Sequence, residues 1–319
     1  MADDFEQGGS KLYASLARSV ADEPVVEALV GEHEPKWEAP LRLFGGVHYL
    51  ELSGMVQHPW AKLRGVLEAN LEWLARFVAE QPIQTNEVQR CWGLLPAFLT
   101  VAEGRRLDLI ELGPSGGLNL YWDRYAYTYG DERWGDRSAG LVLSGRAEGG
   151  PPPDLLRAEV EVASRIGIDR RPVDVATDHG ARLLEAFVWA DQTDRLDRVR
   201  RAIEIAREDP PRLLDGDYVE LLPALLAERD LDSLTVVYHS VMWQYPPQST
   251  RDAVTHAIHS AAAHADDMHR VAWLRYEPNG ILGTPGPMEE MAVDLQVWPG
   301  AERRVLVQTD GHARWVVAL

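Results

Sequence analysis

Acidic residues stand at the carboxyl ends of three predicted strands, where a small ligand could be held. Glu111 lies near the end of a buried strand that leads into a glycine-rich turn, and Asp169 and Asp217 follow two later strands. Open parallel sheets bind ligands just past the carboxyl ends of their strands. Glycines let the backbone approach such a ligand, and a carboxylate can accept from two donors at once. We therefore expect Glu111 to Asn119 to form the floor of a ligand site.

The turn at residues 113–117 has three possible interpretations. A dinucleotide site requires G-x-G-x-x-G, but Ser115 and Leu118 occupy the second and third glycine positions. The same residues match the nucleophile elbow G-x-S-x-G, with Asp294 and His312 following in the order of a hydrolase triad. That fold needs several strands before its elbow, and here helical patterns precede it. The third candidate is the S-adenosylmethionine site of class I methyltransferases, which opens with an acidic residue and alternate glycines.

The later strand ends favour the third candidate, because they resemble that superfamily in order and in type. The resemblance implies that Asp169 accepts from the ribose hydroxyls and that Asp217 accepts from the adenine amino group. The cofactor-binding candidates are Glu111, Gly113, Ser115, Gly117, Asn119, Asp169, Asp217, Tyr218 and His239. His239 ends the fourth strand and is the first candidate for a catalytic base, with Tyr245 as a weaker one. A structural interpretation stays open for each acidic residue, as a helix cap or brace, and for His239, as a hydrogen-bonded strand end.

Four runs resemble a specific bacterial family, domain-of-unknown-function family 2332. They span residues 84–91, 111–120, 167–169 and 237–240. The resemblance covers nearly the whole chain and implies a methyltransferase-like fold with S-adenosylmethionine as cofactor. It implies no substrate.

A dense polar cluster precedes a buried helix. It consists of Gln84, Thr85, Asn86, Glu87 and Arg90. A helix cap with a buried ion pair explains the last three residues, whereas a lid that faces the cofactor or substrate explains all five. The sequence favours neither interpretation.

The elements that position these residues predict an α/β protein. Residues 1–104 have helical patterns, the clearest over 62–80 and 87–102, and are expected to form a helical lid or substrate domain. Strands and helices alternate over 105–319, with strands predicted at 160–168, 212–214, 234–239, 270–276, 291–298 and 303–309, apart from an aromatic insertion at about 125–153. Tyr125, Tyr127 and Tyr129 predict a strand there, paired with residues 141–143. The expected fold is a methyltransferase-like, mainly parallel seven-stranded sheet with an antiparallel carboxyl-terminal hairpin.

The composition of the chain argues against several classes of binding partner. The 319-residue chain carries a formal net charge of −18 and has no long basic block, which argues against nucleic acid or an anionic membrane as partner. No apolar run reaches the ~20 residues of a membrane helix. One cysteine, and an amino terminus without an apolar core, predict a cytoplasmic protein. His256 and His259 share a helix face without an evident third ligand, so no metal site is expected.

The sequence thus predicts a methyltransferase that uses S-adenosylmethionine and acts on a small molecule. Two alternatives stay open: a cofactor-binding protein without catalysis, because the fold alone does not confer chemistry, and an α/β-hydrolase with Ser115 as nucleophile.

Overall fold

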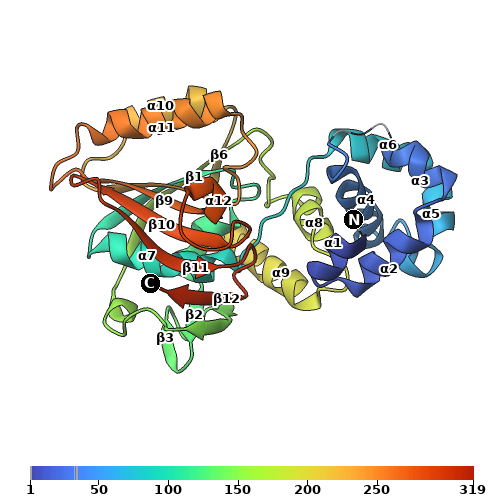
Figure 1. Cartoon of the computed structure of the whole chain (residues 1–319), viewed down its shortest axis with the longest axis horizontal. Helices are drawn as coiled ribbons and strands as arrows, with labels where there is room; N and C mark the ends of the chain where they lie inside the picture. Colours follow the sequence, from blue (N-terminus) through green and yellow to red (C-terminus); the bar gives the residue numbers. More distant parts are fainter. Residues whose placement is uncertain (1, 32, 34) are drawn as a thin grey trace. The chain divides into compact units, whose positions relative to one another are not determined.

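The computed structural model describes residues 2–31, 33 and 35–319, and the chain divides into two compact units. Unit 1 comprises Met1–Thr85 and Val173–Ile203, and unit 2 comprises Asn86–Pro172 and Glu204–Leu319. Both β-sheets belong to unit 2, whereas unit 1 is built from helices (Figure 1). The segment that follows the second parallel strand therefore belongs with the amino-terminal helices, which its sequence did not indicate.

Unit 1 packs its helices around α4, whose buried residues include Leu43, Phe44, Val47 and Leu50. Its elements are α1 (Ala2–Gln7), α2 (Lys11–Val20), α3 (Pro24–Val30), α4 (Glu38–Leu52), η1 (Pro59–Lys62), α5 (Leu63–Ala69), α6 (Leu71–Glu80), α8 (Asp178–Ala186) and the first part of α9 (Thr193–Glu208). The prediction of a single helix over 62–80 is wrong, because the helix is interrupted at Asn70. The Asn70 side-chain amide donates to the Val66 carbonyl, a local bond that competes with helix continuation.

Unit 2 contains a nine-stranded sheet in the order β5-β12-β11-β10-β9-β8-β1-β6-β7. Its strands are β1 (Arg106–Leu112), β5 (Arg146–Glu148), β6 (Glu161–Asp169), β7 (Arg212–Asp215), β8 (Leu234–Ser240), β9 (Val271–Pro278), β10 (Met291–Trp298), β11 (Arg303–Thr309) and β12 (Trp315–Ala318). The strands β7-β6-β1-β8-β9 are parallel, and β9 to β12 pair antiparallel. The order of the parallel strands is that of a doubly wound sheet, so the switch point lies between β1 and β8.

The expected count of seven strands is wrong, because the sheet has nine. Residues 315–318 form β12 against β11 in the predicted hairpin, and β5 from the insertion extends the sheet past that hairpin by pairing in parallel with β12. The mainly parallel sheet and the antiparallel carboxyl-terminal strands are confirmed. The strand β5 is only three residues long and is distant in sequence from β12, so no local pattern predicts it.

Helices cover both faces of this sheet. The helices α10 (Tyr218–Ala227) and α11 (Gln248–Ala262) lie on one face and α7 (Arg90–Ala102) on the other (Figure 1). Because successive strand residues point to opposite faces, Ile110, Leu112 and Val237 pack toward α10 and α11. Tyr238 contacts Phe98 of α7 instead. The buried helix predicted over 87–102 is confirmed in kind, but it begins at Arg90.

The insertion forms a small sheet of β2 (Ala126–Tyr129), β3 (Glu132–Trp134) and β4 (Val142–Ser144), which confirms the predicted pairing of the tyrosine strand. It follows η2 (Leu118–Arg124), and η3 (Leu155–Arg157) and α12 (Asn279–Leu282) complete the described elements of unit 2. Tyr125, Tyr127 and Tyr129 are buried, and each hydroxyl donates to a backbone carbonyl. These tyrosines therefore form part of the core.

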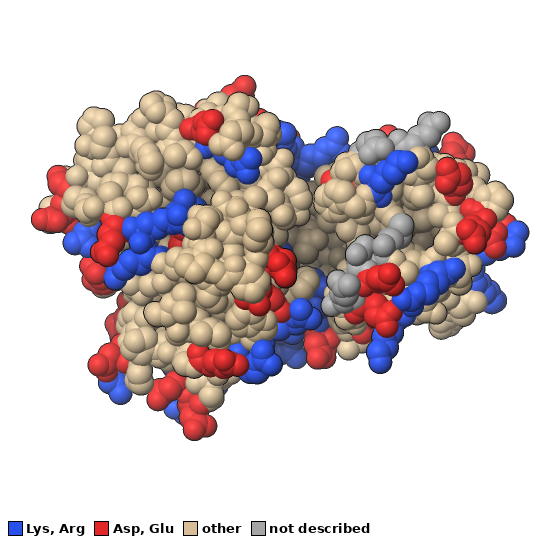
Figure 2. Space-filling model, viewed as in Figure 1, with Lys and Arg blue, Asp and Glu red and all other residues tan. Residues whose placement is uncertain are grey.

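The surface and the helices carry two further observations. On the face in Figure 2, Lys and Arg side chains are interspersed with Asp and Glu and do not form one broad basic patch. Among the described residues, no helix combines the length and the apolar character needed to cross a membrane.

Candidate functional site

The glycine turn leaves β1 at the switch point of the sheet. Gly113, Ser115 and Gly117 have φ values of 71°, 57° and 74°, a left-handed conformation that a serine adopts at a cost. The turn is also closely packed. A Cβ atom at Gly113 would lie 3.2 Å from Met242 Cβ, and one at Gly117 would lie 2.9 Å from Pro211 Cγ. Both glycines are therefore required by the backbone and by their neighbours.

Asp169 connects this turn to the end of β6. One carboxylate oxygen accepts from the Ser115 N–H and the other from the Arg171 N–H, each at 2.9 Å. Each oxygen has two lone pairs, so this carboxylate retains acceptor capacity after both bonds. Asp169 thus holds the turn in place and can still accept from a ligand.

Asp217 and Tyr218 extend the site to the end of β7. Asp217 is the N-cap of α10, where it accepts from the Val219 N–H at 2.9 Å and pairs with Arg170 at 2.7 Å. The bond from the Val219 N–H, with help from Arg170, lowers the pKa of Asp217. The Tyr218 hydroxyl lies 3.6 Å from the position of a Cβ on Gly113, so this ring reaches the glycine turn. The contacts of Asp217 are therefore those of a helix cap. Tyr218, and not Asp217, is the residue that approaches the glycine turn.

Glu111 points into the face covered by α7, and its side chain is 1 % exposed. The Tyr238 hydroxyl donates to Glu111 Oε2 at 3.0 Å, and Asn119 also hydrogen-bonds this carboxyl. The Cys91 thiol lies 3.3 Å from Asn119 Oδ1. Burial raises the pKa of Glu111 to about 8, and the nearby charge of Asp169 acts in the same direction. Glu111 is therefore mostly protonated at neutral pH.

His239 faces the opposite side of the sheet and is fully buried. Its Nδ1 lies 2.7 Å from Glu277 Oε1, an oxygen that also accepts from the Met242 and Trp243 N–H groups. The Trp243 ring stacks on the imidazole at 4.6 Å, and Nε2 has no hydrogen-bond partner among the described residues. Because His239 is fully buried, it can act as a base only after the residues that enclose it move.

Glu277 was missed by sequence reasoning, although a signal for it existed. It lies in β9, one residue beyond the strand predicted over 270–276, in the position that acidic residues occupy on three other strands. The turn that it holds is strained, since Val241 has a φ of 53°, which is unusual for a β-branched residue. Glu277 is thus a positioning residue for the loop that follows β8. Tyr245 lies in the same loop, and its side chain is 60 % exposed.

The predicted lid residues of unit 2 make structural contacts. Asn86 Oδ1 accepts from the Leu118 N–H, just after the glycine turn, and does not cap α7. Glu87 pairs with His312 at 3.0 Å. Arg90 donates to the carbonyls of Gly311 and Ser240 at 3.0 and 3.2 Å. These contacts fit the cap-and-brace interpretation with changed partners.

The two other lid candidates end unit 1, where Gln84 is buried and Thr85 exposed.

The residues of the hydrolase alternative have other partners. Asp294 is buried and pairs with Arg275 at 2.7 Å and Arg303 at 2.5 Å, whereas His312 pairs with Glu87. In the part of the chain that the structure describes, no strand precedes β1. Nor do three or more His, Cys, Asp or Glu side chains gather there as a metal site.

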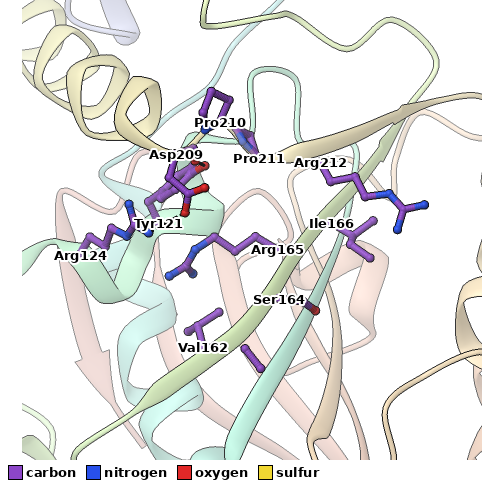
Figure 3. A pocket seen from close by; sticks show the side chains of 11 residues that line it. Tyr121, Arg124, Val162, Ser164, Arg165, Ile166, Asp209, Pro210, Pro211 and Arg212 are labelled. Carbon is purple, nitrogen blue, oxygen red and sulfur yellow. Dashed lines mark hydrogen bonds and ion pairs between the residues drawn. The ribbon is translucent and has the colours of Figure 1, made fainter.

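A cavity of about 350 Å³ lies along β6 (Figure 3). It opens because β7 pairs only with residues 166–169, which leaves the rest of β6 at an edge. Arg165 pairs with Asp123 at 2.7 Å, and Arg124 with Asp209 at 2.8 Å, beside the Tyr121 ring. A register shift in the pairing of β6 with β1 lies beside the same cavity, at residues 162–164. Bulges and inward charges protect exposed strands from pairing, so this cavity needs no ligand to explain it.

Comparison with known proteins identifies a family and no characterised relative. A family model described as an uncharacterized protein conserved in bacteria matches residues 1–317. No curated protein matches the chain.

Proposed function

We propose that this chain, which belongs to the bacterial domain-of-unknown-function family 2332, transfers a methyl group from S-adenosylmethionine to a small molecule. One observation carries the proposal: a strained glycine turn lies at the switch point of a doubly wound sheet, bonded to an acidic residue from the next strand. Ligands of such sheets bind at this point. The cofactor is a cationic nucleoside without phosphates, so it suits carboxylates better than a dinucleotide would.

The residues around the turn fit the parts of this cofactor. Asp169 has acceptor capacity for the ribose hydroxyls, and Tyr218 supplies an aromatic ring beside Gly113. Asp217 has a carboxylate at the neighbouring strand end for the adenine amino group. Glu111 lies close enough to Asp169 for their charges to interact, so ionisation of its buried carboxyl would place negative charge beneath a bound sulfonium.

Methyl transfer needs alignment more than covalent chemistry. The lone pair of the acceptor forms the bond to the methyl carbon as the carbon–sulfur bond breaks, which leaves S-adenosylhomocysteine. Holding both partners in line and excluding water supplies most of the acceleration. If the acceptor is a hydroxyl or an amine, its proton passes to a base. His239 is the first candidate, once the residues that enclose it have moved, and the exposed Tyr245 is the second.

Calorimetric titration of the full chain with S-adenosylmethionine and S-adenosylhomocysteine tests the proposal. We expect binding of both ligands, weakened about tenfold or more by Asp169→Asn and severalfold by Tyr218→Leu, which removes the aromatic ring. The Asn side chain retains one acceptor oxygen but places an NH₂ group against a backbone donor. Asp154→Asn, a change at an exposed aspartate, is the matched control and should bind as the wild type does. Failure of the wild type to bind either ligand would refute the proposal.

Binding without catalysis is a second candidate, favoured by the complete burial of His239. Incubation with methyl-labelled S-adenosylmethionine and a bacterial small-molecule extract separates the two functions. Transfer of label to a small molecule, lost in His239→Asn, indicates the enzyme. Tight cofactor binding without transfer indicates the binding protein. Covalent labelling of Ser115 by a fluorophosphonate would favour a hydrolase instead.

A further inference from the structure

A cavity of about 480 Å³ lies within unit 1 and shares no residue with the proposed cofactor site. Its lining comes from α4, α6 and α8 and the segments that follow α4 and α6. Its lining includes Tyr49, Met55, Trp73, Arg76, Glu80 and Arg182. This volume falls within the range of about 300–1,000 Å³ that is usual for small-molecule sites.

Stacked aromatic rings form one wall of this cavity. Trp73 stacks on Tyr49 with centroids 5.8 Å apart, and on Phe77 with centroids 5.1 Å apart. The Tyr49 hydroxyl lies 2.7 Å from His179 Nδ1, which ties the wall to α8. Tyr49 and Phe77 are buried, but Trp73 remains partly exposed. A wall fixed by stacking and a hydrogen bond is preformed for a flat ring, because aromatic faces favour offset stacking.

Two arginines accompany this wall. Arg76 is exposed on α6, and Arg182 on α8 is partly exposed, with Asp178 as its nearest acidic partner at 3.9 Å. Glu80 is the one acidic side chain in the lining. Two guanidinium groups against one carboxylate disfavour an organic cation and favour an anion, which is unusual on a chain with a net charge of −18.

We propose that this cavity binds a planar aromatic or heteroaromatic small molecule that carries a carboxylate. The ring stacks against Trp73, and the carboxylate meets Arg76 and Arg182. The mouth includes the flexible side chain of Met55, which is 61 % exposed and can adapt to rings of different shape. This inference uses only residues of unit 1 and does not depend on methyl transfer.

Three probes of similar size separate ring stacking from charge. We expect 2-naphthoate to bind the full chain in ligand-observed NMR and calorimetry, without any nucleoside present. The uncharged 2-naphthamide and the non-aromatic decahydro-2-naphthoate should each bind at least about tenfold more weakly, because each lacks one of the two contacts. Equal binding of the three probes, or no binding of 2-naphthoate, would overturn the proposal.

Variants locate the binding. Trp73→Leu should weaken 2-naphthoate binding about tenfold and Arg182→Gln roughly fivefold. Trp37→Leu, a change at an exposed tryptophan outside the cavity, and Arg157→Gln are matched controls that should bind normally. Arg76→Glu changes an exposed residue, so it should fold even if Trp73→Leu does not, and it should weaken 2-naphthoate binding tenfold or more. Unchanged binding in Arg76→Glu would place the ligand elsewhere. Because no cofactor is present, these results are independent of the proposed function.

Discussion

The buried carboxyl of Glu111 gives the sharpest test of the structure, through the substitution Glu111→Gln. Gln has nearly the same shape and keeps an acceptor for the Tyr238 hydroxyl, but it cannot ionise. Burial raises the pKa of Glu111 from 4.5 to about 8. The folded protein therefore holds this proton more tightly than the unfolded chain does. Its contribution to stability is largest at low pH and declines as the pH rises from 4.5 to 8.

The size of this decline follows from the shift. Each pKa unit corresponds to about 1.36 kcal/mol. The raised pKa of Glu111 therefore lowers the unfolding free energy of the wild type by roughly 1 kcal/mol at pH 5, about 3 kcal/mol at pH 7 and nearly 5 kcal/mol at pH 9. The Gln variant has no such cost. Relative to the wild type, it should gain about 4 kcal/mol of unfolding free energy between pH 5 and pH 9. Other titrating groups largely cancel in this comparison.

Urea unfolding of both proteins at pH 5, 7 and 9 measures the effect. With a slope of about 2–3 kcal/mol/M, a gain of about 4 kcal/mol moves the midpoint by roughly 1.5 M. Fluorescence and circular dichroism should be followed together, because a chain of two units need not unfold in one step. A constant difference between variant and wild type across this pH range would refute the burial of an ionisable Glu111 against Tyr238.

Other substitutions test the turn and its neighbours. Gly117→Ala should destabilise the protein by about 2–4 kcal/mol in thermal or urea unfolding, whereas Gly104→Ala, with a similar φ but open space, should cost about 1 kcal/mol, so equal losses would contradict the contact with Pro211. Glu277→Ala removes one acceptor from three donors and should cost about 3–5 kcal/mol, and Glu277→Gln, which keeps an acceptor oxygen, should cost clearly less. Cys91 is buried and its pKa is raised well above the usual value by burial, so a thiol reagent should label it only in urea, and fast labelling of the native protein would contradict this position.

The sequence by itself determined the local elements and their order. The bounds of β10 and β11 are as predicted, residues 291–298 and 303–309, and β1, β6, β7, β8 and β9 begin and end within two residues of the expected positions. Hydrophobic periodicity and turn residues report local backbone preference, which is why such patterns are informative for strands and for the glycine turn. The positive φ values at Gly113 and Gly117 follow from the same local chemistry.

Only the tertiary structure decided what each functional side chain contacts. Glu111, Asp169 and Asp217 all lie at or just past the carboxyl ends of strands, but Glu111 points under α7, Asp169 bonds the glycine turn and Asp217 caps α10. Glu277 reaches His239 across adjacent strands, and β5 joins β12 from the far side of the sequence. These contacts depend on strand register and on the face that each residue presents, and both are set by packing between segments distant in sequence. A local pattern therefore indicated the candidate site, and long-range pairing determined what each of its carboxylates contacts.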